Sequence, residues 1–131
     1  MSFTPYDLEW ETEYLPTKTA TQYNPGDLIA NDATDNVPAT STTGRPLGII
    51  DELKPSTDTS TDDIKVLVPK TINAKMRGNV GTGTLTKAMI GRRVDLKDAD
   101  EVDVNASSVD PLIVAGFISA TEGVFKINQA I

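Results

Sequence analysis

The sequence contains no cysteine and no histidine. The chain therefore forms no disulfide, and it offers neither a Cys/His zinc site nor a histidine-based nucleophilic triad. None of its apolar runs approaches the roughly 18 residues that indicate a membrane-spanning helix. The opening MSFTPYDLEWE lacks the basic and apolar regions of a secretory signal. From these absences we expect no membrane partner and no chemistry that depends on a thiol or an imidazole.

Aromatic residues are also scarce, at 5% of the chain, whereas threonine, glycine and proline are frequent, with 17, 9 and 8 copies. Threonine favours strands, and glycine and proline favour the turns between them. A chain of 131 residues suits one domain with one core. We therefore predict an all-β fold, a small β-barrel or β-sandwich, with at most one short helix.

Short apolar segments follow one another at a spacing of about ten residues, with turn signals between them. A single β-domain over residues 23–131 is predicted to begin at the turn Asn24-Pro25-Gly26. The helical turn is expected at residues 85–90, ended by Gly91, and residues 54–63 and 95–110 are expected to be polar loops. The expected strands are 27–30, 37–40, 45–53, 64–80, 111–119 and 124–131.

Residues 6–14, YDLEWETEY, alternate between aromatic or apolar side chains and acidic ones, so a strand here would have one face of each kind. We interpret residues 1–22 as an extended N-terminal arm that contacts a neighbouring subunit. The aromatic face would anchor the contact, and the acidic face would fix its register. The alternative is that the segment folds back as an edge strand of its own domain. The predicted arm contacts are Tyr6, Leu8, Trp10 and Tyr14.

The net charge of −7 is distributed unevenly. Residues 1–62 carry 11 acidic and 3 basic residues, whereas residues 64–93 carry seven basic residues and no acidic one. Between residues 64 and 77 the apolar side chains share one parity and Lys65, Lys75 and Arg77 the other, which predicts a sheet with a basic outer face. Pro69 predicts a break or an edge at mid-length. This face is expected either to meet the acidic arm of an adjacent copy or to be solvated, since an acidic protein binds nucleic acid poorly. The basic residues assigned to an interface are Lys65, Lys75, Arg77, Arg92 and Arg93.

Three short motifs invite comparison with known chemistry. GTGTLT at residues 81–86 is similar to a dinucleotide-binding loop but lacks the third glycine and the helix that should follow. DTST at residues 58–61 is similar to the Asp-Thr-Gly of aspartic proteases, but its third residue is serine and its loop is expected to be solvated. The acidic residues between 95 and 103 lack the glycine and glutamate of an EF-hand, so a solvated loop is preferred to a weak cation site. These acidic residues are Asp95, Asp98, Asp100, Glu101 and Asp103. We predict no catalytic, cofactor-binding or metal-binding residue and expect no enzymatic activity.

Two longer stretches resemble the capsid decoration proteins of tailed phages, also called cement proteins. NPGDLIANDATDNVPATSTTGRPLGIID, residues 24–51, has a Gly-Asp strand start, a short loop, a strand of the VPAT kind and a PLGI strand. IGRRVDLKDADEVDVNASSVDPLIVAGFIS, residues 90–119, has a glycine, a VDL strand, a polar loop and an apolar strand that ends in GF. The resemblance covers roughly residues 24–128, and its motifs are mostly turn residues and alternating apolar residues.

The resemblance implies a small β-barrel or β-sandwich that oligomerises, often as a homotrimer, on the outer surface of a mature icosahedral head. Such a protein is made in the cytoplasm of the bacterial host. Its function is mechanical, because it bridges neighbouring copies of the major capsid protein and resists the pressure of packaged DNA. No cofactor and no specific nucleic acid are implied. The alternative is another β-domain of the virion, such as a tail, head-completion or host-surface glycan-binding protein.

Overall fold

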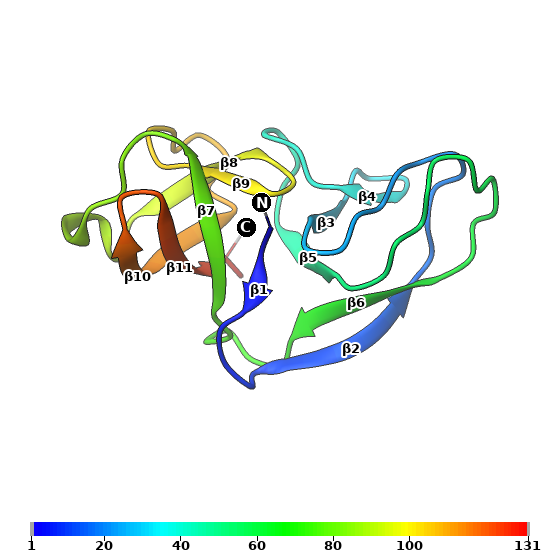
Figure 1. Cartoon of the computed structure of the whole chain (residues 1–131), viewed down its shortest axis with the longest axis horizontal. Coiled ribbons are helices and arrows are strands. Elements are labelled where there is room, and N and C mark those ends of the chain that lie inside the picture. The colour runs from blue at the N-terminus through cyan, green and yellow to red at the C-terminus, as the bar shows by residue number, and fades with distance from the viewer. Residues whose placement is uncertain (1, 131) are drawn as a thin grey trace.

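The computed structural model describes residues 2–130, and the part of the chain that it describes is built from strands and loops. The exception is one short 3-10 helix, η1 (Lys87–Met89). This composition confirms the predicted all-β class with at most one short helix. Within these residues no helix is long and apolar enough to cross a membrane. The strands form two sheets, one in each half of the view in Figure 1.

The first sheet closes into a small barrel. Its strands are β7 (Met76–Thr82), β8 (Arg93–Asp98), β9 (Glu101–Asp103), β10 (Leu112–Ser119) and β11 (Glu122–Ile127), with β1 (Thr4–Pro5) added beside β7. The strands pair antiparallel in the order β7-β11-β10-β8-β9, and β9 then pairs in parallel with β7. This last pairing closes the ring, and a closed ring has no free edge. Gly91, with φ of +94°, ends η1 and leads the chain into β8 as predicted.

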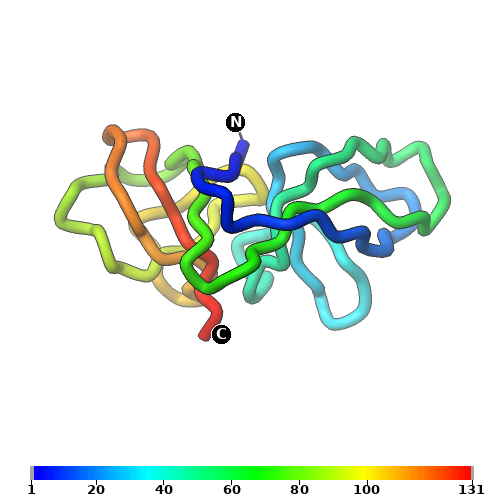
Figure 2. The backbone as a smooth tube through the Cα atoms, turned by 90° about the horizontal axis from the view of Figure 1, so that it is seen from below, coloured from blue at the N-terminus to red at the C-terminus, as the bar shows by residue number. Residues whose placement is uncertain are grey.

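The second sheet is open and entirely antiparallel. Its strands are β2 (Trp10–Leu15), β3 (Leu28–Asn31), β4 (Asn36–Pro38), β5 (Pro46–Ile50) and β6 (Ile64–Pro69). They pair in the order β2-β6-β5-β3-β4, so β2 and β4 are the two edges. Figure 2, which views the molecule from below, shows β2 and β6 running together across the side nearest the viewer.

One core joins the barrel interior to one face of the open sheet. Its buried side chains from the sheet include Leu28 and Ile49, and those from the barrel include Met76, Leu112 and Phe125. Because these residues belong to one cluster, the two sheets form one compact unit rather than two separate domains.

A smaller core lies on the opposite face of the open sheet, where Tyr23 is fully buried among apolar side chains. The loop that begins at Lys54 covers this core. Lys54 is 4% exposed, and its ammonium group donates hydrogen bonds to the carbonyl oxygens of Asp58 (3.2 Å) and Ser60 (2.8 Å). The predicted loop over residues 54–63 is therefore a loop, but it begins with a buried residue rather than an exposed one.

The N-terminal segment belongs to the domain, which corrects the predicted division into an arm over residues 1–22 and a domain over 23–131. Phe3 is 1% exposed in the main core, and its N–H donates to the carbonyl oxygen of Gly26 (2.7 Å). β1 pairs with the start of β7, and β2 pairs with β6 along its whole length. Gly78 makes room for the Phe3 ring, because a Cβ at this position would lie 2.5 Å from Cε1 of Phe3. The segment therefore follows the alternative expectation, because it folds back as an edge strand of its own domain.

Two further expectations differ from the structure. Residues 95–110 were expected to be a loop, but β8 extends into them and β9 forms within them, because Leu96 and Val102 bury their side chains in the core. The apolar inner face predicted between residues 64 and 77 includes Ile72, yet this side chain is 68% exposed. β6 ends at Pro69, which cannot donate a ladder hydrogen bond, and the loop after it breaks the alternation.

Candidate interaction surface

The bend between β1 and β2 is fixed to the loop between β6 and β7. The carboxylate of Asp7 accepts hydrogen bonds from the N–H groups of Glu9 (3.1 Å) and Lys75 (3.2 Å). The carbonyl oxygen of Lys75 accepts from the backbone N–H of Tyr6 (2.8 Å) and from the indole N–H of Trp10 (2.9 Å). Figure 1 shows the two segments meeting at the lower end of the molecule. The bend is therefore held in one conformation by contacts within the chain.

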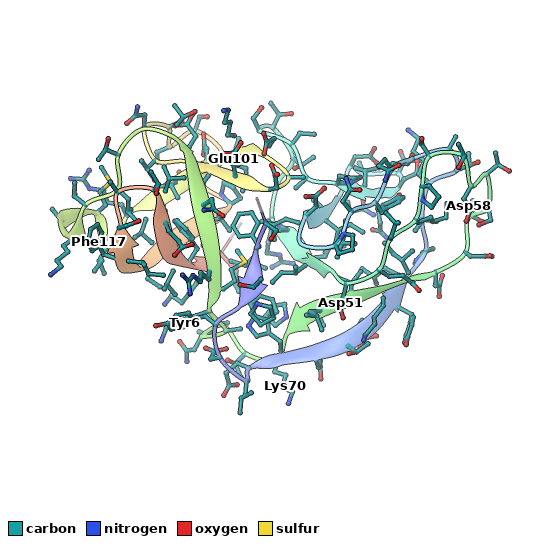
Figure 3. All side chains as sticks on the ribbon, viewed as in Figure 1. Tyr6, Asp51, Asp58, Lys70, Glu101 and Phe117 are labelled. Atoms are coloured by element: carbon teal, nitrogen blue, oxygen red, sulfur yellow. The ribbon has the colours of Figure 1, made fainter. Side chains whose placement is uncertain are left out.

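Three exposed apolar side chains lie on the two segments that meet at this end. Leu8 is 92% exposed, Ile72 on the facing loop is 68% exposed, and Tyr6 is 55% exposed. The N–H of Lys70 donates to the carbonyl oxygen of Glu9 (2.8 Å), which holds the two loops together. Figure 3 labels Tyr6 and Lys70 at this end. We call Tyr6, Leu8 and Ile72 the apolar tip, and exposed apolar groups on a fixed backbone are typical of a contact surface.

β2 has the two faces that its alternation predicts. Thr12 lies opposite Leu67 of β6, so Trp10, Thr12 and Tyr14 share the face that looks toward the main core. Trp10 packs partly against that core, whereas Tyr14 is 61% exposed. Of the predicted arm contacts, Tyr6, Leu8 and Tyr14 are therefore free for a partner, and Trp10 is already used within the chain.

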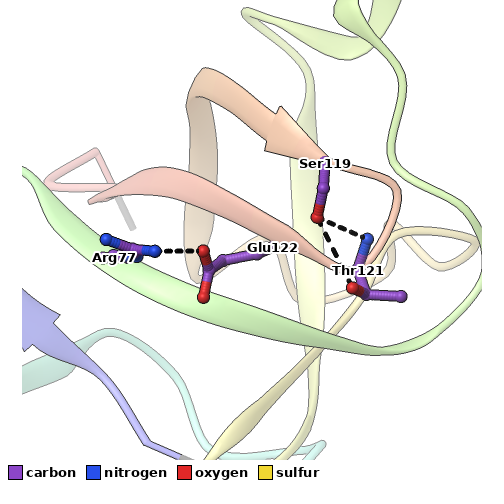
Figure 4. A network of polar contacts seen from close by, with 4 residues as sticks. All are labelled: Arg77, Ser119, Thr121 and Glu122. Carbon is purple, nitrogen blue, oxygen red and sulfur yellow. Dashed lines mark hydrogen bonds and ion pairs between the residues drawn. The ribbon is translucent and has the colours of Figure 1, made fainter.

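The basic residues predicted to share one face are divided between the two sheets. Lys65 lies on β6, and its ammonium group is 3.2 Å from the carboxylate of Asp51. Arg77 lies on β7 in the barrel and forms an ion pair with Glu122 of β11 (Figure 4). In the same view the N–H of Thr121 donates to the hydroxyl of Ser119 (3.3 Å) in the turn that carries Glu122.

The remaining basic residues of the predicted interface lie elsewhere again. Lys75 belongs to the loop that fixes the bend, and its backbone rather than its charge makes the recorded contacts. Arg92 and Arg93 are exposed at the start of β8, on the barrel. A single basic face over residues 64–93 is therefore not formed, because β6 and β7 belong to different sheets.

Three acidic residues come together at the turn between β8 and β9. Carboxylate oxygens of Asp98, Asp100 and Glu101 lie within 4.8 Å of one another. The hydrogen bond with Asp98, followed by burial, raises the pKa of Asp100 to about 6. Burial also opposes the charge of Asp98, but its hydrogen bonds with Asp100 outweigh burial and place the pKa of Asp98 below its usual value. The pair therefore holds one proton in mildly acidic solution.

The other two acidic residues of the predicted cation loop point elsewhere. Asp95 accepts hydrogen bonds from residues 108–110, and Asp103 accepts one from the N–H of Asn105 (2.9 Å). Oxygen ligands suit Ca²⁺, but only three of the five residues gather, and below about pH 6 a shared proton relieves the repulsion between two of them. We assign no metal role to this cluster.

Replacing Asp100 with asparagine is expected to stabilise the protein at neutral pH and to flatten its pH dependence. The pKa of Asp100 rises from 3.8 to about 6 on folding, so its stabilising contribution is full below about pH 4 and is lost as the pH rises through 6. An amide donates to Asp98 at every pH. Urea denaturation of both proteins across this range measures the difference, with Asp62→Asn as the exposed control. Parallel pH profiles for the wild type and Asp100→Asn would contradict the shared proton.

Two residues of the surface were missed in the sequence. Ile72 was placed on the apolar inner face because it keeps the parity of β6, but the break predicted at Pro69 also ends that alternation. Asp7 was seen only as a member of the acidic face. Aspartate side chains often accept the backbone N–H of the residue two positions later, and Asp7 does so with Glu9.

Comparison of the chain with protein-family models, curated proteins and solved structures found no significant match.

Proposed function

We propose that this protein is a capsid decoration protein, which binds the outer surface of a mature phage head and stabilises it by bridging capsid subunits. The observation that carries the proposal is the apolar tip, in which Leu8 is 92% exposed on a bend whose backbone is fixed by hydrogen bonds. A fixed backbone loses little conformational entropy when a partner buries its side chains. The motifs between residues 24 and 128 support the choice of the shell as that partner.

In this proposal the apolar tip anchors the protein and the charges guide it. Burying a large apolar side chain contributes about 1.5–3 kcal/mol, whereas an exposed ion pair contributes only about 0–1 kcal/mol. The apolar tip and Tyr14 of β2 therefore supply most of the affinity for the major capsid protein, and the acidic side chains of β2 steer the encounter. A homotrimer at three-fold sites of the shell would add avidity, because several tips engage one symmetric surface.

The proposal is tested by mixing the purified protein with expanded, DNA-filled heads from the same source, sedimenting them and counting the bound copies per shell. Saturation at a fixed ratio to the major capsid protein, without binding to the unexpanded precursor, is the expected result. A folded protein that stays in the supernatant at every concentration would exclude the decoration function.

Replacing Leu8 with serine is expected to weaken binding to heads by roughly tenfold to a hundredfold, since the burial of one leucine is lost. The melting temperature should be unchanged, because Leu8 is 92% exposed in the free protein. Leu53→Ser is the matched control, because Leu53 is 60% exposed but lies in the loop over residues 51–63. Equal effects of the two substitutions on binding would show that the tip is not the anchor.

A further inference from the structure

The outer side of β2 is the one long strand edge that the described fold leaves open. The barrel closes on itself through the pairing of β7 with β9. The other edge of the open sheet, β4, has three residues and includes Pro38, which lacks an N–H. β1 has two residues, whereas β2 has six, and no strand of the described chain lies beyond it. An exposed edge of this length is a template for another strand.

The pairing with β6 determines which backbone groups of β2 point outward. The N–H of Lys70 donates to the carbonyl oxygen of Glu9, so Glu9 and Lys70 form a hydrogen-bonded pair in the antiparallel ladder. Such pairs alternate along a ladder. Glu11 and Glu13 therefore direct their backbone groups toward β6. The residues that direct them outward are Trp10, Thr12 and Tyr14.

The two acidic side chains of β2, Glu11 and Glu13, take part in none of the ion pairs among residues 2–130. Glu11 lies opposite Val68 and Glu13 opposite Val66, so no lysine or arginine faces either glutamate across the ladder. The free edge thus carries a row of uncompensated negative charge.

This row of negative charge determines which strand can pair with the outer edge of β2. In an antiparallel pairing of two copies of β2, outward-pointing residues must face outward-pointing residues, so glutamate faces glutamate in the registers centred on residues 11, 12 and 13, which pair most of the strand. With Thr12 at the centre, Glu11 of each copy lies opposite Glu13 of the other. Like charges directly opposite each other destabilise a strand pair, whereas a lysine or arginine at these positions would pair with each glutamate.

We propose that the outer edge of β2 is a docking site for an extended segment of a partner protein that carries lysine or arginine at alternate positions, and that the edge is closed to a second copy of this chain. The partner strand adds to the sheet through the outward groups of Trp10, Thr12 and Tyr14. The apolar tip lies at the N-terminal end of the same strand, so one partner can engage both. The inference concerns the segment used in the proposed function but does not depend on the partner being a capsid subunit.

A charge exchange tests the docking site without any head or capsid. The double variant Glu11→Lys/Glu13→Lys supplies a basic strand of otherwise identical sequence. When it is mixed with the wild type, we expect a one-to-one complex at low salt, at least roughly tenfold tighter than either protein with itself. NMR amide exchange should slow at Trp10, Thr12 and Tyr14, and higher salt should weaken the complex.

The control variant Asp62→Lys/Asp63→Lys makes the same change of net charge at two exposed residues outside β2. It should form no such complex with the wild type. Three results would overturn the inference: no complex when both proteins are folded, a complex that leaves these three amides unprotected, or equal self-pairing of the wild type through β2. A synthetic peptide of alternating lysine and valine should protect the same amides, and its glutamate and valine counterpart should not.

Discussion

Replacing Phe3 with alanine is expected to lower the free energy of unfolding by about 3–5 kcal/mol, the usual range for a buried phenylalanine. Phe3 is 1% exposed and belongs to the core that joins the barrel to the open sheet. Its ring lies against Gly78, where no side chain is present to fill the space that alanine would leave. The N–H of Phe3 also fixes its position by donating to Gly26 (2.7 Å).

Urea denaturation, with Trp10 as the fluorescent probe, measures this loss. Thr4→Ala is the matched control, because Thr4 is adjacent in sequence but exposed. The same substitution of Phe3 should speed amide exchange at Tyr6, whose N–H bonds to Lys75 just beyond β1. If Phe3→Ala changed stability no more than Thr4→Ala, the N-terminal segment would not be part of the folded core.

The last two strands of the chain, β10 and β11, could be predicted because their pattern is local. Residues 111–119 form a continuous apolar run that becomes β10, and the predicted strand at 124–131 becomes β11, where Phe125 and Ile127 are buried. Gly91 ends the predicted helical turn because its positive φ is costly for other residues. Each of these features depends on residues that are neighbours in the sequence.

The pairing of the N-terminal segment could not be predicted for the opposite reason. The alternation in residues 6–14 indicates a strand with two unlike faces, but it is the same whether the strand pairs with β6 of its own chain or with another molecule. The choice depends on contacts between residues about 65 positions apart, such as Trp10 with Lys75. Charge patterns have the same limit, because Lys65 and Arg77 are close in sequence and lie on different sheets.

The hydrogen bonds of Asp95 could not be predicted either, because they also join residues that are distant in the sequence. Its segment is rich in acidic residues, which predicts solvation, yet Asp95 is only 3% exposed. The donors that make its burial tolerable come from residues 108–110, on the far side of β9. A carboxylate can be buried when such donors surround it, and nothing in the local sequence reports that they do.

Replacing Asp95 with alanine is expected to destabilise the protein by about 3 kcal/mol or more, because it leaves several buried donors without an acceptor. The carboxylate accepts the N–H groups of Ser108 (3.0 Å), Val109 (3.0 Å) and Asp110 (2.8 Å), and the hydroxyl of Ser108 (2.8 Å). It therefore fixes the turn that leads from β9 into β10. Ser108→Ala removes only the hydroxyl bond and should cost about 1 kcal/mol.

The pH dependence of stability distinguishes the contribution of the Asp95 charge from that of the side chain's shape. Burial raises the pKa of Asp95, but the hydrogen bonds from Asp110, Ser108 and Val109 outweigh burial and leave it below the usual value of 3.8. Its contribution to stability is therefore present above that value and is lost as the pH falls through the lowered pKa. Asp95→Asn keeps the shape without the charge, so we expect its stability to fall less steeply than that of the wild type in acid.

Urea denaturation of both proteins from neutral pH to about pH 3 measures how steeply each loses stability. If the two slopes were the same, the turn would be held by shape rather than by the ionised carboxylate.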